Sequence, residues 1–233
     1  LSLQEAQGLS KKDLTYFITK LDPYPTLKND LIILNSNDPF TLLVNSDVKR
    51  FLRLFFDLGE DYRVKVLNKK IPNELLNKIS LEKDFEKFLR YVVFDKKLTN
   101  IQKSLFLFET NKELPPQIQF LLGINAVNND NINIAYNFFL NSYNKSYLKI
   151  DKDKSLFWLY LVSKNTSFLQ ELSTSWDNNI YSLYAKEIYR IKPDNIVFNV
   201  DLKNTKSSFD IYDAFKWMEV VEDTKKKIGR AHV

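Results

Sequence analysis

The chain has 233 residues, of which 44% are hydrophobic and 27% are charged, and it contains no cysteine. This composition is typical of a globular protein, and the lack of cysteine excludes disulfides, thiolate nucleophiles and zinc sites with cysteine ligands. The formal net charge of +5 fits either lysine-rich helix faces in water or an anionic partner, such as nucleic acid, a membrane surface or a cell-wall polymer. Nucleic acid has little support, because the only run of basic residues is Lys225–Lys227.

Helices are predicted from the start of the chain. Glycine and proline are scarce, with four and seven residues, which favours helices over a many-stranded β fold. Ser10 is the predicted N-cap of a helix that reaches about Lys20. Further on, Ser46 is predicted to cap a helix over Asp47–Leu58, which stops at Gly59.

Two more helices are predicted before residue 110. Ser80 precedes apolar residues at helical spacing, which are Leu81, Phe85, Phe88, Leu89 and Val92. Thr99 and Gln102 fit a capping box for the next helix, because a threonine N-cap and a glutamine three residues later can satisfy each other's backbone amides.

A pair of helices is predicted after the two prolines Pro115 and Pro116, since proline suits the first turn of a helix. Asn128–Asn131 forms the turn between the two helices. Five residues of the pair have the spacing of a tetratricopeptide-type hairpin: Leu122, Gly123, Ala126, Ala135 and Phe139. Because neighbouring pairs do not repeat this pattern, we expect irregular stacking of helical hairpins and not a strict repeat array.

The segment SLFWLYLVS contains seven apolar or aromatic residues in a row. It is too short for a membrane span, which needs ~20 such residues, so we expect a helix that neighbours cover on more than one face. Asp151 or Asp153 near its start and Lys164 near its end favour the helix dipole. Trp158 and Tyr160 are expected to pack in the core, with ligand binding as the less favoured alternative.

Candidate catalytic residues are few. His232 is the single histidine, which excludes a Cys–His dyad and a histidine-based metal cluster, and the four glycines lie too far apart for a phosphate-binding loop. Close carboxylate pairs occur at Glu60–Asp61, Glu82–Glu86 and Glu219–Glu222, and we interpret them as solvated helix faces. No catalytic, cofactor-binding or metal-ligating residue is therefore predicted.

Part of the chain resembles a known family. Residues 147–190, with the motifs FWLYL and YSLYAKE (Tyr181–Glu187), resemble the end of the α-helical superhelix of soluble lytic murein transglycosylases from Gram-negative bacteria. Residues 209–220, FDIYDAFKWMEV, resemble the segment that connects this superhelix to a lysozyme-like catalytic domain. The resemblance covers about Ile101–Val220.

The resemblance implies a periplasmic enzyme that cleaves peptidoglycan glycan strands without hydrolysis and leaves a 1,6-anhydromuramic product. In the family one glutamate acts as general acid and then as base. The Glu-Ser pair and the Gly-Leu-Met-Gln-type motif of the catalytic domain occur nowhere in this sequence, so no catalytic residue is carried over. What remains is an all-α superhelix that positions glycan strands and needs no cofactor.

The expected partners are peptidoglycan glycan strands, with other cell-wall enzymes as further candidates, and no nucleic acid or membrane span is expected. Two other functions stay open. The first is an α-repeat scaffold that binds proteins, and the second, which rests on charge alone, is a nucleic-acid-binding helical domain.

The predicted organisation has three parts: an α-superhelical domain over residues 1–195, a connecting segment over residues 196–227 and a tail over residues 228–233. Ile191–Ser208 is expected to be looser and partly extended, with a last helix after it. The tail back-translates to a DNA sequence that resembles a common sequencing adapter, so we expect it to be non-native. The chain begins at Leu1 without a methionine or a visible signal peptide, so the native start is expected upstream.

Overall fold

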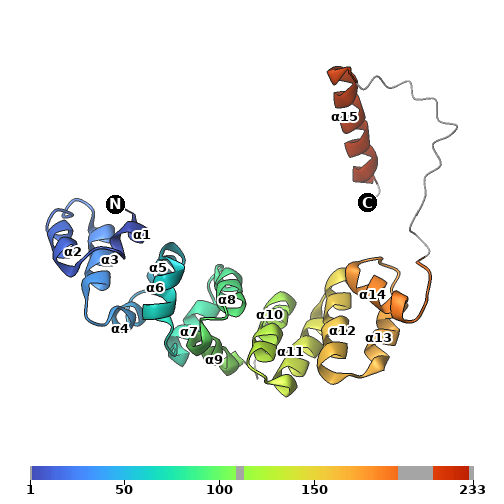
Figure 1. Ribbon diagram of the computed structural model, residues 1–233, viewed down its shortest axis with the longest axis horizontal. Helices are drawn as coiled ribbons and strands as arrows, with labels where there is room; N and C mark the ends of the chain where they lie inside the picture. The colour runs from blue at the N-terminus through green and yellow to red at the C-terminus, as the bar shows by residue number, and fades with distance from the viewer. Residues whose placement is uncertain (1, 109–112, 194–211, 231–233) are drawn as a thin grey trace. The chain divides into compact units, whose positions relative to one another are not determined.

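The computed structural model describes residues 2–108, 113–193 and 212–230 (Figure 1). In these ranges the secondary structure is helical and contains no strand, which confirms the predicted all-α fold class. The chain forms two compact units, Leu1–Pro193 and Asp194–Val233.

The first unit contains a series of helices joined by turns and short loops. Its first part contains α1 (Leu3–Ala6), α2 (Lys11–Ile18), α3 (Pro25–Asn35), α4 (Pro39–Val44), α5 (Val48–Asp57), α6 (Glu60–Tyr62), the π-helix η1 (Arg63–Leu67), α7 (Asn73–Ser80), α8 (Phe85–Phe94), α9 (Thr99–Ser104) and the 3-10 helix η2 (Leu105–Phe108). Its later part contains α10 (Pro116–Asn128), α11 (Ile132–Lys145), α12 (Lys149–Ser163), α13 (Thr166–Ser173) and α14 (Ile180–Ile188). The second unit contains α15 (Ala214–Arg230).

Helices of the first unit pack chiefly against their neighbours in the chain. α2 packs on α3, and each helix from α10 to α14 packs on the next, while α10 also packs on α8 (Figure 1). A large apolar core extends from Ala6 to Leu159, and a smaller cluster among α12, α13 and α14 contains Leu156, Leu169, Leu172 and Ala185. Packing between neighbours is what short connections between helices favour.

Local signals placed several helix ends correctly. The Ser10 hydroxyl accepts a hydrogen bond from the backbone amide of Asp13 at 3.2 Å, as an N-cap does. Pro116 is the first residue of α10, and the turn before α11 contains Asp130 with a left-handed φ of 58°.

The predicted N-cap Ser46 is wrong, because the neighbouring residue takes that role. The Asp47 carboxylate accepts hydrogen bonds from the amides of Lys49 and Arg50, at 3.3 and 3.1 Å. The Ser46 hydroxyl instead donates to the Leu43 carbonyl, at 2.7 Å, and so belongs to the end of α4. A carboxylate that holds two backbone amides is the stronger cap.

The predicted role of Gly59 as a helix stop also needs correction. α5 ends at Asp57, and Gly59 has φ −67°, which is not the left-handed conformation of a terminating glycine. Gly59 is instead the N-cap of α6. Its amide donates to Gln7 Oε1 at 2.9 Å, and a Cβ at this position would lie 2.6 Å from Gln7 Nε2. The glycine therefore permits the close approach of the Gln7 side chain.

One further predicted helix start, at Ser80, and the predicted capping box at Thr99 are wrong. Ser80 is the last residue of α7, and α8 begins only at Phe85, so Leu81 lies in the turn between them and is 87% exposed. Thr99 is not a cap, since the N-cap of α9 is Leu98 without a side-chain hydrogen bond. Gln102 is buried instead.

The side chain of Gln102 completes the end of a different helix. Its Nε2 donates to the carbonyls of Val92 and Asp95, at 2.9 and 3.0 Å, and these carbonyls belong to the end of α8. The last carbonyls of a helix have no hydrogen-bond donor within the helix. The Gln102 amide supplies one, and this stabilises the buried position of its side chain. This explains why the predicted capping box does not form.

The tetratricopeptide-type spacing brings Gly123 of α10 against Phe139 of α11. A Cβ on Gly123 would lie 2.5 Å from Cε1 of the Phe139 ring. Two other rings hold Phe139 in place, those of Phe120 and Trp158, with centroids 5.4 and 5.5 Å away. Glycine is therefore required here by close helix packing.

We expect Gly123→Ala to destabilise the protein by about 1–3 kcal/mol, because overpacking outweighs the ~1 kcal/mol that alanine contributes as a better helix former. Urea unfolding followed by circular dichroism measures the change. In a Phe139→Leu background the same substitution should cost less, because the clashing ring is gone. Gly8→Ala is the control, since the nearest atom to its Cβ would lie at 3.6 Å. Equal losses at Gly8 and Gly123 would contradict this account.

The SLFWLYLVS segment lies in α12, which packs against α11, α13 and α14. Leu156 and Leu159 are fully buried, and no apolar side chain between Leu156 and Val162 is exposed. Trp158 packs in the core as predicted, and Tyr160 is partly buried against the smaller cluster. No helix among the residues that the structure describes is long and apolar enough to cross a bilayer.

The predicted helix that follows the connecting stretch is present as α15. Most of the stretch Ile191–Ser208 lies outside the described residues, as do residues 231–233 with His232.

Candidate functional site

One face of α8 presents basic and aromatic side chains to solvent. Lys87, Arg90, Tyr91 and Phe94 follow one another at helical spacing and therefore share this face. Tyr91 is 39% exposed and Phe94 is 62% exposed. The opposite face of α8 is buried and carries Phe85, Phe88, Leu89, Val92 and Val93. The amphipathic pattern that folds α8 thus also leaves two large rings in water.

Lys87 and Tyr91 join two residues from other elements in a row of two neighbouring aromatic rings with a cation at each end. The Lys87 Nζ lies 4.0 Å from the ring centroid of Phe56 in α5, and the rings of Phe56 and Tyr91 are 5.4 Å apart. The guanidinium carbon of Arg63 in η1 lies 5.2 Å from the Tyr91 centroid. We call these four residues the cation–aromatic stack. Each cation lies within the ~6 Å at which an aromatic face attracts it.

The backbone of α5 fixes Arg63 in the stack. Its Nη1 donates to the Leu58 carbonyl and, at 3.3 Å, to the Phe55 carbonyl, both at the end of α5. These carbonyls have no partner within the helix, so the guanidinium satisfies them and is held in place. The stack is therefore built on rigid helices and not on loops.

Two pockets flank the stack. The first, of about 360 Å³, lies between α5 and the turn before α8, and Phe56 and Lys87 contribute to its wall. The second, of about 380 Å³, is lined by Arg63, Tyr91 and Phe94 among others. Eight of the residues that line the two pockets are basic and five are acidic. We call the stack and its two pockets the basic–aromatic surface.

Some charges of this surface are neutralised within it. Glu86 pairs with Arg90 and Glu60 pairs with Lys97, each at 2.7 Å. The hydrogen bond from Lys97 lowers the pKa of Glu60, and the same bond raises the pKa of Lys97, so both groups stay charged over a wide pH range.

Other lysines of the surface stay available to a ligand. Within the described part of the chain, four lysines that line the pockets have no carboxylate within 4.0 Å: Lys49, Lys83, Lys87 and Lys96. The surface therefore offers unpaired ammonium groups beside exposed rings. Ammonium groups attract anions, and exposed rings pack against flat apolar groups.

The carboxylate pairs singled out in the sequence lie in open positions. Glu60 and Asp61 are exposed at the start of α6, and Glu82 before α8 and Glu86 in its first turn are partly exposed. Glu219 and Glu222 are exposed on α15. Sequence reasoning missed the basic–aromatic surface, although the spacing of Lys87, Arg90, Tyr91 and Phe94 was a usable signal.

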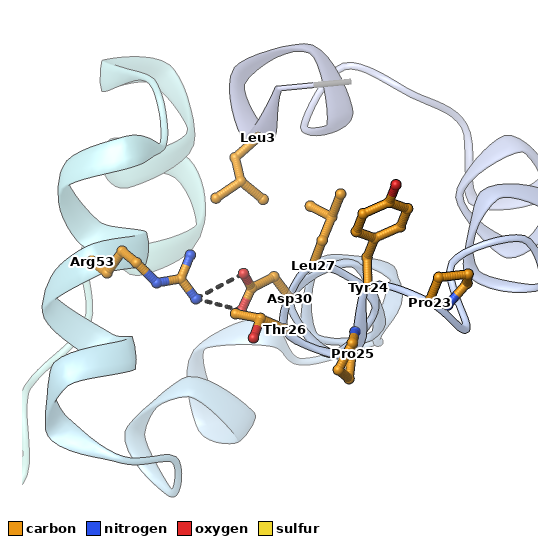
Figure 2. A pocket seen from close by; sticks show the side chains of 8 residues that line it. All are labelled: Leu3, Pro23, Tyr24, Pro25, Thr26, Leu27, Asp30 and Arg53. Carbon is orange, nitrogen blue, oxygen red and sulfur yellow. Dashed lines mark hydrogen bonds and ion pairs between the residues drawn. The ribbon is translucent and has the colours of Figure 1, made fainter.

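A buried acid lies at a third pocket, shown in Figure 2. Asp30 of α3 is 1% exposed, and Arg53 of α5 donates from Nη2 to its two carboxylate oxygens at 2.8 and 2.7 Å (Figure 2). A second guanidinium, that of Arg50, lies 3.8 Å from Oδ1. The pocket has a volume of about 390 Å³ and is bordered by Leu3, Leu27 and Tyr24 among others. Arg53 also lines the pocket between α5 and α8.

A second buried acid, Asp153, is bound by polar side chains of the protein itself. It was predicted as an acid at a helix start, yet it is fully buried. Its Oδ2 accepts hydrogen bonds from Ser175 at 2.6 Å and from Asn179 at 2.8 Å. Its Oδ1 accepts no hydrogen bond and is balanced by the Lys149 ammonium 2.8 Å away.

Asn179 links Asp153 to α14. Asn179 is the N-cap of α14, and its Oδ1 accepts hydrogen bonds from the backbone amides of Tyr181 and Ser182. Asp153 therefore positions the start of α14.

Within the described ranges, no group of three acidic or histidine side chains could hold a metal ion. No protein-family model matches the chain, and no curated protein matches it.

Proposed function

We propose that the first unit is an α-superhelix of irregular hairpins, tetratricopeptide-like at α10 and α11, which positions peptidoglycan glycan strands. It would be the non-catalytic region of a periplasmic lytic transglycosylase, whose cleavage step belongs to a catalytic domain. The resemblance of residues 147–190 and 209–220 to that family motivates the proposal. The observation that carries it is the basic–aromatic surface.

The chemistry of a peptidoglycan strand suits this surface. The apolar C–H faces of sugar rings pack against flat aromatic side chains, and Tyr91 and Phe94 expose such rings. Peptides attached to the strand carry carboxylates, which the unpaired lysines attract. Because exposed charges act over about 10 Å at 0.1 M salt, several lysines along a surface can guide a polymer without one deep site.

Retention on insoluble peptidoglycan tests the proposal. We expect the protein to sediment with peptidoglycan at low salt and to be released as salt screens its charges. Replacing Lys83, Lys87 and Lys96 by glutamine should weaken retention about tenfold, since each exposed contact is modest but three are lost. Phe94→Ala should weaken it further, with little effect on folding, because that ring is 62% exposed.

The matched control removes the same charge elsewhere. Lys12, Lys103 and Lys145 are exposed, line none of the three pockets and make no ion pair within the described residues, so their replacement by glutamine should leave retention nearly unchanged. If both triple variants lost the same amount of retention, the net charge of the protein and not this surface would explain its binding to peptidoglycan. Equal retention on an uncharged polysaccharide, or none on peptidoglycan, would contradict the proposal.

A second candidate function is a scaffold that binds another protein. The observation that favours it is an apolar face of α14, on which Ile180, Tyr184 and Ile188 are 75%, 44% and 47% exposed at helical spacing. Retention on peptidoglycan that does not depend on Lys83, Lys87 and Lys96 would favour this candidate. Other cell-wall enzymes are the partner class that we propose for it.

A further inference from the structure

Asp30, the buried acid at the wall of the pocket, lies near two arginines, of which Arg53 lines the pocket and Arg50 does not. Asp30 faces two guanidiniums, those of Arg53 and Arg50, so the buried acid balances one of them and leaves one positive charge. Arg53 uses a single nitrogen for Asp30, and within the described residues its Nε and Nη1 donate no hydrogen bond. Figure 2 shows a second guanidinium nitrogen turned toward the space beneath Leu3. The pocket thus presents a held, partly unused guanidinium.

The remaining walls of the pocket are mostly apolar. Leu3, Leu27, Pro23 and Pro25 surround the space, and Tyr24 stands at its rim with 64% of its surface exposed (Figure 2). A volume of about 390 Å³ is at the small end of ligand pockets. An anion with an aliphatic body of a few atoms suits this combination better than phosphate or a bulky aromatic acid.

The position of Arg53 connects this pocket to the basic–aromatic surface. Arg53 lines both this pocket and the pocket between α5 and α8. A polymer that lies along α8 can therefore keep its main chain on the basic–aromatic surface and place a short branch beneath Leu3.

We infer that this pocket binds the free carboxylate of a short aliphatic peptide, with Arg53 as the residue that receives it. The carboxylate accepts a charge-assisted hydrogen bond from Arg53 Nη1, a nitrogen that Asp30 leaves unused. Asp30 holds Arg53 in position. The source of the peptide rests on the proposed function, because peptidoglycan strands carry such peptides as branches.

The probe is N-acetyl-Ala-Ala with a free carboxylate, titrated into the full chain and followed by NMR. We expect shift changes in α1, α3 and α5, and about tenfold weaker binding of the C-terminal amide of the same peptide, which lacks the charge. Equal affinity for the acid and the amide, or shift changes elsewhere, would overturn the inference.

The variant Thr26→Glu tests the site without breaking the ion pair. Thr26 is an exposed residue of the pocket in the first turn of α3, where an acid does not disfavour the helix. The added negative charge should weaken binding of the free acid about tenfold and leave the amide unaffected. Asn29→Glu adds the same charge to an exposed position of α3 that does not line the pocket, and should change little. Equal effects of the two variants would also overturn the inference.

The two proposals can fail separately. If the peptide acid binds as expected but peptidoglycan does not retain the protein, the inference about the pocket is supported and the proposed function is contradicted. If peptidoglycan retains the protein through Lys83, Lys87 and Lys96 but the peptide acid does not bind, the proposed function is supported and the inference about the pocket is contradicted.

Discussion

Replacing Asp153 with alanine is expected to lower the free energy of unfolding by about 3–5 kcal/mol, because it breaks a buried ion pair and leaves its partners unpaired. The hydroxyl of Ser175 and the amide of Asn179 both lose their acceptor. For a chain of this size such a loss lowers the melting temperature by roughly 10 °C. Circular dichroism during heating measures it.

The matched control for Asp153 is Glu74→Ala. Glu74 pairs with Lys78 at the same i,i+4 spacing and at 2.7 Å, but its side chain is 82% exposed, so little change is expected. Asp153→Asn should lie between the two, since it keeps an acceptor oxygen for Ser175 and removes the charge. If Glu74→Ala and Asp153→Ala destabilised the protein equally, burial would not be the cause.

The second large effect concerns activity. In an assay with purified peptidoglycan we expect the 233-residue chain to release no anhydromuropeptides. General acid catalysis needs a carboxyl that holds its proton in a dry pocket. The two buried carboxylates of the described residues, Asp30 and Asp153, are acceptors for basic partners. Glu187, within the YSLYAKE motif, is exposed to water on α14.

A fusion distinguishes an inactive protein from a non-catalytic region. A lytic transglycosylase catalytic domain joined after Lys227 should produce anhydro products, and the lysine substitutions at Lys83, Lys87 and Lys96 should then reduce the rate on long strands. If the chain alone produced anhydro products and Glu187→Gln abolished them, the catalytic site would lie within it and the proposed division of roles would be wrong.

The hairpin of α10 and α11 shows how far local sequence signals reach. Pro116 starts the first helix, an asparagine-rich turn ends it, and Gly123 and Phe139 meet across the pair. Each signal acts within one turn or one hairpin, so the spacing of the residues was enough. The packing of Trp158 in α12 was predictable for the same reason, because an aromatic residue inside a long apolar run has few places outside the core.

The wrong helix ends arose where two polar residues could serve one helix end. Ser46 and Asp47 are both acceptable caps, and the end of α4 takes the hydroxyl while α5 takes the carboxylate. Gln102 could have formed a capping box with Thr99, but its side-chain amide donates hydrogen bonds to the last carbonyls of α8. Competition of this kind is decided by a neighbouring helix, which the local pattern does not contain.

The sequence by itself determined that the chain is helical, where its most periodic helices lie and which of their faces are apolar, because these properties depend on residues three or four apart. Only the tertiary structure decided the sites. Asp30 and Arg53 are 23 residues apart, Asp153 and Ser175 are 22 apart, and the cation–aromatic stack draws on three elements. A buried charge is stable only beside its partner, and that partner is set by how helix faces meet, which the period of a single helix does not specify.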